Sequence, residues 1–210
     1  MISPTALEVL FVGIAVTLAA LIVARPELTR VRGGKILAFV TLFLLPVLGG
    51  WLGFSEHMER AESTRFCLSC HVMHDFGQSL YVDDPSYIPA KHFQNNLVPR
   101  DHACYTCHTD YTMFGTMHSK FRGLRHLYVQ YLGHPPAAAD IKLYTPFNNR
   151  ECLHCHARMR VFEEQPKHNK TPDMMAKINS NQMSCMTSKC HDTVHEVSTL
   201  KDATFWKGAQ

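Results

Sequence analysis

The chain has 210 residues, with 21 lysine and arginine residues against 18 acidic ones, so its formal net charge is only +3. This balance, together with the lack of any polybasic run in the sequence, argues against nucleic-acid binding. The length is enough for one modest domain with accessory segments.

Two apolar segments come first along the chain. Residues 7–24 are apolar apart from Glu8 and Thr17, and residues 36–54 contain Thr41 as their one polar residue. A helix that crosses the hydrocarbon layer needs about 20 apolar residues. We therefore predict two transmembrane helices. A cleaved signal peptide is the alternative for the first segment, but positive charge normally precedes the apolar region of such a peptide, and residues 1–6 carry none.

The connection between the two segments, residues 25–35, carries four basic residues and one acidic residue. Basic loops face the cytoplasm in membrane proteins. The sequence therefore predicts a membrane anchor over residues 1–54, in the cytoplasmic (inner) membrane. It predicts that residues 55–210 form a domain on the extracytoplasmic, periplasmic side.

Every cysteine of the chain belongs to a pair that a histidine follows directly. Two residues separate the cysteines of three pairs, and four residues separate those of the last pair, in CMTSKCH. The four groups are Cys67, Cys70 and His71; Cys104, Cys107 and His108; Cys152, Cys155 and His156; and Cys185, Cys190 and His191.

The repeated histidine distinguishes between three explanations of the cysteine pairs. Disulfides would not require a histidine after every second cysteine. Zinc sites use both side chains but do not usually repeat Cys-x-x-Cys-His as a unit. Attachment of haem c explains every cysteine, because two thiols bind one porphyrin and the next residue presents an imidazole to the iron. We predict four covalently bound haems c.

Residues 55–210 contain no long apolar run, and they are few for four porphyrins. The haems must then supply much of the apolar interior. The predicted fold class is a membrane-anchored tetrahaem c-type cytochrome: two transmembrane helices followed by a small, mostly α-helical or irregular domain wrapped around haem. Irons held so close together would conduct electrons.

The order of motifs and histidines after residue 55 resembles that of the NapC/NirT/NrfH family of membrane-anchored multihaem quinol dehydrogenases. The residues that carry the resemblance are NNRECLHCH around the third motif, a lone histidine after it, the histidine that closes CHDTVH, and CHVM at the first motif. The resemblance covers roughly residues 55–196. This chain departs from the family in having two amino-terminal helices instead of one.

The resemblance implies the second axial ligands of three haem irons, namely His92, His168 and His195. His118 and His126 are the main rivals for these positions. At the first haem the resemblance implies that Met73 replaces His71 as the ligand. The alternative is that Met73 only packs against the ring.

The resemblance also implies a quinol site near the first haem. Lys120 is the single lysine in the segment after the second motif, and Asp110 is the candidate for the acidic group there. The predicted function is oxidation of quinol from the membrane pool, menaquinol for example, and electron transfer to an extracytoplasmic redox protein, or to a multihaem reductase in a stable complex. The alternatives are an anchor and relay subunit without its own quinol site, and a terminal reductase of a small molecule.

Overall fold

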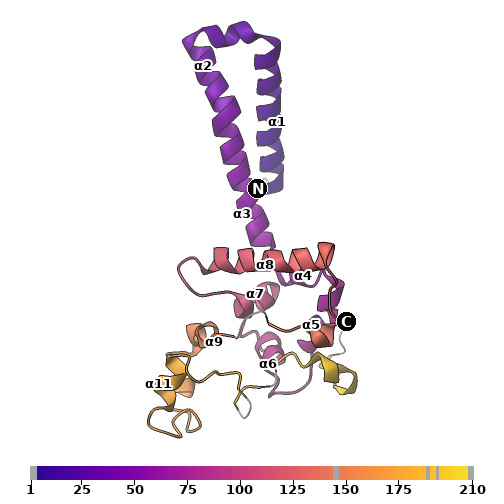
Figure 1. Cartoon of the computed structure of the whole chain (residues 1–210), viewed down its shortest axis with the longest axis vertical. Helices are drawn as coiled ribbons and strands as arrows, with labels where there is room; N and C mark the ends of the chain where they lie inside the picture. Colours follow the sequence, from indigo (N-terminus) through magenta and orange to yellow (C-terminus); the bar gives the residue numbers. More distant parts are fainter. Residues whose placement is uncertain (1–3, 144–146, 188–189, 193, 208–210) are drawn as a thin grey trace. The chain divides into compact units, whose positions relative to one another are not determined.

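The computed structural model describes residues 4–143, 147–187, 190–192 and 194–207 (Figure 1). The chain forms two compact units, Met1–Ala61 and Glu62–Gln210. The first unit ends later than the predicted boundary after residue 54, because its last helix continues through a polar stretch to Arg60. An ion pair between Glu56 and Arg60, 2.8 Å long and one helical turn apart, supports this extension.

The first unit contains the two predicted membrane helices. They are α1 (Pro4–Ala24), then the short turn η1 (Pro26–Arg30), and a continuous helical segment made of α2 (Arg32–Phe39), the π-helical turn η2 (Val40–Leu44) and α3 (Leu45–Arg60). Both helical segments are long and apolar enough to cross a membrane. The connection is shorter than the predicted loop over residues 25–35, because helix α2 already begins at Arg32.

The π-helical turn immediately precedes Pro46. Within it the N–H group of Leu45 donates to the carbonyl of Val40, five residues back. Proline has no N–H group, and its ring crowds the preceding turn of a helix. A single wider turn is a common accommodation, so the helix continues past the proline instead of ending there.

Close packing joins α1 to α3 near the ends of the two helices. Glycine at position 53 lets the carboxylate of Glu8 approach the backbone of α3 closely, and a side chain there would displace this carboxylate. Nearby, the guanidinium group of Arg60 donates a 2.9 Å hydrogen bond to the hydroxyl of Thr5. The polar residue Glu8, which interrupts the first apolar segment, therefore lies against the backbone of its partner helix.

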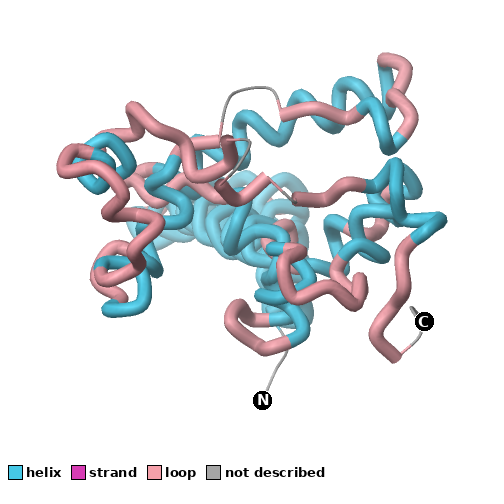
Figure 2. Tube along the Cα trace, turned by 90° about the horizontal axis from the view of Figure 1, so that it is seen from below, coloured by secondary structure: helices cyan, strands magenta, loops and turns pink. Residues whose placement is uncertain are grey.

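The second unit consists of short helices and loops, and no extended strand occurs within the described residues (Figure 2). Its helices are α4 (Thr64–Cys67), α5 (His74–Ser79), α6 (Ile88–Gln94), α7 (Ala103–His108), α8 (Gly115–Leu132), α9 (Asn149–His156), α10 (Arg160–Glu163) and α11 (Met174–Asn179). Shorter 3-10 turns are η3 (His71–Met73), η4 (Arg100–His102), η5 (Ala138–Asp140) and η6 (Val197–Asp202).

Two small apolar clusters hold this unit together, and α6 contributes to both. Phe93 packs in the cluster of Leu80, Val98 and Ala103. Ala90 packs in the cluster of Val82, Tyr87 and Leu200. Because both sides of α6 are fixed in this way, the histidine between them, His92, is carried on a restrained helix.

Candidate haem-binding site

The second and third Cys-x-x-Cys-His motifs each lie on one helix, α7 and α9. A helix turns by about 100° per residue, so residues i, i+3 and i+4 share one face. Cys104, Cys107 and His108 therefore lie together on one face of α7, and the third motif is arranged in the same way on α9. Asn148 begins α9 by accepting a 2.9 Å hydrogen bond from the N–H group of Arg150.

The first and fourth motifs have other local structures. Cys67 ends α4, and His71 begins the 3-10 turn η3. The longer spacing of the fourth motif would spread its cysteines around a helix, and the described part of this motif is a loop. That loop is closed by a 3.0 Å hydrogen bond from the N–H group of His191 to the carbonyl of Cys185. The bond brings the histidine back beside the first cysteine despite the two extra residues.

Consecutive motifs lie next to one another. The Cys67 thiol hydrogen-bonds with Cys104, which joins the first motif to the second. The hydroxyl of Thr64 reinforces this junction by accepting a 2.9 Å hydrogen bond from the N–H group of Ala103. Cys107 is close enough to Cys155 for the two thiols to interact electrostatically, which links the second motif to the third.

The junction between the third and fourth motifs is the most extensively hydrogen-bonded. The Cys152 thiol hydrogen-bonds with Cys185. The buried side chain of Asn149 donates to the carbonyls of Ile178 and Met183 at 2.8 and 2.7 Å, and accepts from the N–H group of Cys185 at 2.8 Å. The four motifs therefore form a series whose order in space follows their order in the sequence.

Three of the four motif histidines each face one of the histidines predicted as second ligands. The ring centroids of His92 and His156 are 6.0 Å apart. Those of His108 and His195 are 6.2 Å apart, and those of His168 and His191 are also 6.2 Å apart. These residues come from segments widely separated in the sequence, and no local pattern indicates which histidine faces which motif.

These separations match the space that one iron between two imidazoles requires. A metal–imidazole nitrogen bond is about 2 Å long. In a five-membered ring with bonds of about 1.33 Å, each nitrogen lies about 1.1 Å from the centroid. Two imidazoles on opposite sides of one iron therefore have centroids about 6.2 Å apart. All three observed pairs agree with this value, so the residues present fit haem iron.

Each predicted second ligand is also held through its Nδ1 atom. His92 Nδ1–H donates to the Ile88 carbonyl at 2.9 Å, and His168 Nδ1–H donates to the Phe162 carbonyl at 3.0 Å. His195 Nδ1 lies 2.7 Å from Oγ of Ser79, whose own proton goes to the Phe76 carbonyl at 2.6 Å, so the imidazole is the donor. Such bonds fix the tautomer and leave Nε2 as the free donor atom for a metal.

The pKa values of His195 and of three motif histidines lie below the usual value, which favours the neutral form that binds a metal. Burial lowers the pKa of His195 to about 4, and the neighbouring His108 contributes to the decrease. The pKa of His108 is lowered mainly by burial as well, as are those of His156 and His191, with smaller contributions from nearby histidines.

The rivals and the first-motif ligands have different surroundings. His118 lies 3.3 Å from the carboxylate of Asp110 rather than facing a motif histidine. The pKa of His126 is lowered by desolvation and by the charge of Arg125. His71 and Met73 occupy the same 3-10 turn, with His71 exposed and Met73 half-buried. His71 and Met73 therefore both lie close to the cysteines of the first motif, where a haem would be attached.

The two residues predicted for quinol binding flank one polar pocket of about 400 Å³. Asp110 lines this pocket, together with Glu62, Tyr105 and others. Lys120 borders it, because its Nζ atom lies 3.9 Å from Glu62 and 4.4 Å from the centre of the Tyr105 ring. No motif in the sequence indicates that Glu62 and Tyr105 line this pocket.

The pKa values of Asp110 and Lys120 are both lowered, but for different reasons. Burial alone would raise the pKa of Asp110, but hydrogen bonds from Thr112 and His118 and the charge of Arg150 outweigh it, so the pKa lies below its usual value. Burial lowers the pKa of Lys120, against the opposing effect of Glu62. Asp110 is therefore ionised at neutral pH and able to accept a proton.

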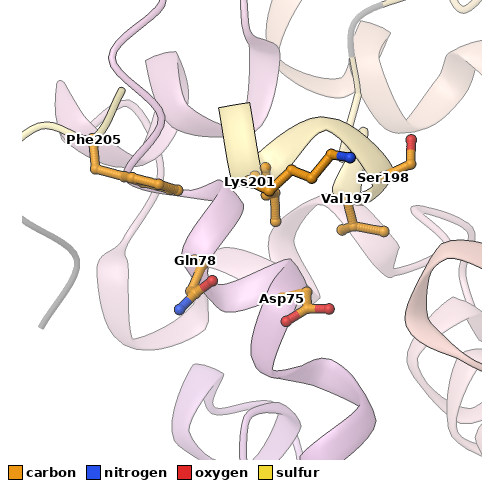
Figure 3. A pocket seen from close by; sticks show the side chains of 7 residues that line it. Asp75, Gln78, Val197, Ser198, Lys201 and Phe205 are labelled. Carbon is orange, nitrogen blue, oxygen red and sulfur yellow. The ribbon is translucent and has the colours of Figure 1, made fainter. Parts of the chain in front are cut away.

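A second pocket, of about 490 Å³, lies between α5 and η6 (Figure 3). Its lining includes Asp75, Gln78 and Lys201. None of the predicted haem or quinol residues lines it. It is therefore separate from both predicted sites.

Repeated cysteine pairs with adjoining histidines, and imidazoles facing one another across the width of one iron, define a class: the multihaem cytochromes c. Comparison with known families narrows this class. The model of the N-terminal region of the NapC/NirT cytochrome c family matches residues 31–200. The chain belongs to the NapC/NirT cytochrome c family, which confirms the resemblance inferred from the motifs and supports electron transfer and membrane anchoring.

Individual relatives carry the name cytochrome c-type protein NapC. The chain is 29% identical over 135 residues to the one from Escherichia coli strain K12, which covers 57% of this chain and 64% of that protein. It is 28% identical over 100 residues to the one from Haemophilus influenzae, covering 46% of each. The chain therefore spans less than two thirds of the length of these relatives. No solved structure matches the chain significantly.

Proposed function

We propose that the chain binds four haems c, takes electrons from quinol in the cytoplasmic membrane, and passes them to an extracytoplasmic redox protein. The observation that carries the proposal is the continuous series of four motifs, three of which pair a motif histidine with a second imidazole at 6.0–6.2 Å. When bound, haem c supplies reversible one-electron transfer at each motif. Electron transfer to a multihaem reductase, bound to the chain in a stable complex, fits the same arrangement of motifs.

The chain's own residues would bind and orient the cofactors. The paired ligands are His195 with His108, His92 with His156, and His168 with His191. Bonds to backbone carbonyls and to Ser79 hold the second ligands in one tautomer. Because these imidazoles are restrained in the folded protein, little reorganisation would accompany a change of iron charge.

The first motif differs from the other three in our proposal. Met73 would take the ligand position instead of His71, and the half-buried setting of Met73 beside the exposed His71 supports this choice. A thioether ligand raises the reduction potential of a haem relative to two imidazoles. A higher potential at the first motif suits the point where electrons enter.

Oxidation of quinol also releases two protons, which the site must accept. Ionised Asp110 is the proposed acceptor, and His118, 3.3 Å away, offers the next position for a proton. Lys120 would orient a quinol oxygen at the border of the same pocket. Both candidate residues border a pocket that also contains Tyr105, from the helix of the second motif.

The quinol site is tested with the full-length holoprotein in detergent and a soluble menaquinol analogue. We expect Asp110→Asn and Lys120→Ala to slow haem reduction by the analogue by about 100-fold, the usual size of a lost acid–base group. Reduction by dithionite should be unchanged. The matched controls are Asp173→Asn and Lys177→Ala, because these two residues form an ion pair elsewhere on the surface of the same unit.

Unaltered quinol kinetics in both site variants would favour the anchor and relay subunit, which has the haems without a quinol site. Turnover of a small oxidised nitrogen or sulfur compound by the purified protein alone would instead favour a terminal reductase.

The ligand assignment is tested separately, by spectroscopy. His92→Ala, His168→Ala and His195→Ala should each convert one low-spin haem to the high-spin form and leave its thioether bonds intact. His118→Ala is the control, since His118 contacts Asp110 and not a motif histidine. A low-spin spectrum unchanged by one of the first three substitutions removes that histidine from the ligand set.

A further inference from the structure

Helix α8 (Gly115–Leu132) carries a row of large apolar residues that are exposed to solvent. Met117, Phe121, Leu124, Tyr128 and Tyr131 recur at spacings of four, three, four and three, so they form one stripe. Their exposed fractions lie between 45% and 78%. A surface helix normally turns its apolar residues toward the protein core and its polar residues toward water.

The other face of α8 is polar and attached to the unit. Ser119 accepts a 3.0 Å hydrogen bond from the N–H group of Asp110, directly after the second motif. Lys120 reaches Glu62 and Tyr105. The less exposed positions Ser119, Gly123 and Gln130 follow this inner face. The helix is therefore fastened on the side of the second motif, and the apolar stripe takes no part in these contacts.

We propose that α8 lies in the plane of the membrane interface and inserts this apolar stripe among the lipids. An interfacial helix combines an apolar face rich in aromatic and aliphatic residues with basic residues and no acidic ones on its polar side. The stripe contains phenylalanine and two tyrosines, the aromatic residues that suit the headgroup level. No acidic residue occurs over residues 111–139, whereas Lys120, Arg122 and Arg125 are basic, so anionic lipids would attract the helix.

Chain connectivity places α8 within reach of the bilayer. The apolar part of the second membrane helix ends at Phe54, and α3 adds about 9 Å of helix up to Arg60. Glu62, which Lys120 contacts, follows after at most about 7 Å of chain. A helix is about 10 Å wide. The chain is therefore short enough for a helix tied to Glu62 to reach the lipid headgroups. The proposal depends on the membrane anchor and not on quinol being the electron donor.

The test uses the full-length holoprotein in vesicles that contain phosphatidylglycerol and a phospholipid with a diazirine on its acyl chain. After photolysis, labelled peptides are identified by mass spectrometry. We expect label on the α8 stripe as well as on α1. The peptide containing Val161 of α10, an equally exposed apolar residue, serves as the water-facing control and should stay unlabelled. Vesicles without phosphatidylglycerol should give less label on α8 and the same label on α1.

A double substitution, Leu124→Glu with Tyr128→Glu, should reduce labelling of α8 to the level of the Val161 peptide. Labelling of α1 and the haem content should not change, which separates loss of insertion from loss of folding. Val161→Glu is the matched control and should leave α8 labelled. An unlabelled α8 beside a labelled α1 in the wild-type protein overturns the proposal. Cross-links between copies through Tyr128, with no lipid label, overturn it in favour of a second copy on this face.

Discussion

Replacing Asn149 by alanine should loosen the junction between the third and fourth motifs. The Asn149 side chain is 1% exposed and makes three hydrogen bonds of 2.7–2.8 Å to the segment that contains Cys185. Alanine leaves the carbonyls of Ile178 and Met183 and the N–H group of Cys185 without this partner. A buried group left unpaired costs about 1–3 kcal/mol. Allowing for water that enters the vacated space, we expect a loss of about 3 kcal/mol in the free energy of local opening.

Hydrogen–deuterium exchange of the holoprotein, followed by mass spectrometry, measures this loss. The N–H groups of Gln182 and Met183 both donate to the carbonyl of Lys177 and do not bond to Asn149 themselves. Their exchange should accelerate about 100-fold, because 1.4 kcal/mol corresponds to a factor of about ten. Peptides from α6, across the unit, should exchange as in the wild-type protein.

The matched control is Asn169→Ala. Asn169 also donates to two backbone carbonyls, those of Glu163 and Gln165, but in an exposed setting where water replaces it. A change of at most about 0.5 kcal/mol is expected there. Equal exchange near Gln182 in the Asn149 and Asn169 variants, at the same haem content, would refute the role that we give to the buried amide.

The remaining predictions concern haem content, topology and the first motif. Mass spectrometry of the mature protein should give four covalent haems, and three haems would mean that Cys185 and Cys190 have another role. A cysteine at Gly33, where the structure leaves open space for a side chain, should be shielded from a membrane-impermeant thiol reagent in intact cells; ready labelling would reverse the predicted orientation. The native protein should contain one high-spin haem, which Met73→Ala should perturb alone, and four low-spin haems would exclude Met73 as a ligand in place of His71.

The sequence predicts local features of this protein well. The lengths of the apolar segments are sufficient to predict two membrane helices. The spacing of Cys104, Cys107 and His108 puts them on one face once this segment is known to be helical, but the first motif has the same spacing and is not one helix. Hydropathy marks only the apolar residues 36–54, whereas helical structure continues through the polar residues up to Arg60.

Long-range pairings were beyond prediction from the sequence. The bond of His92 to the carbonyl of Ile88 spans one helical turn and follows from the helix alone. The contact of Ser79 with His195 joins residues 116 positions apart, and no local pattern indicates it. Asn149 lies only three residues before the first cysteine of the third motif, yet its buried contacts depend on where the loop of the fourth motif lies. Such pairings can be identified only from the three-dimensional fold.

The small size of the two apolar clusters in the second unit has a consequence for biosynthesis. Two groups of four buried side chains are too few to order a polypeptide of this length by themselves. The newly synthesised polypeptide should therefore remain extended and open to the enzymes that attach haem, with its cysteines accessible. It is equally open to proteases during that interval. A cell deprived of haem should thus degrade this polypeptide and should not accumulate a folded precursor.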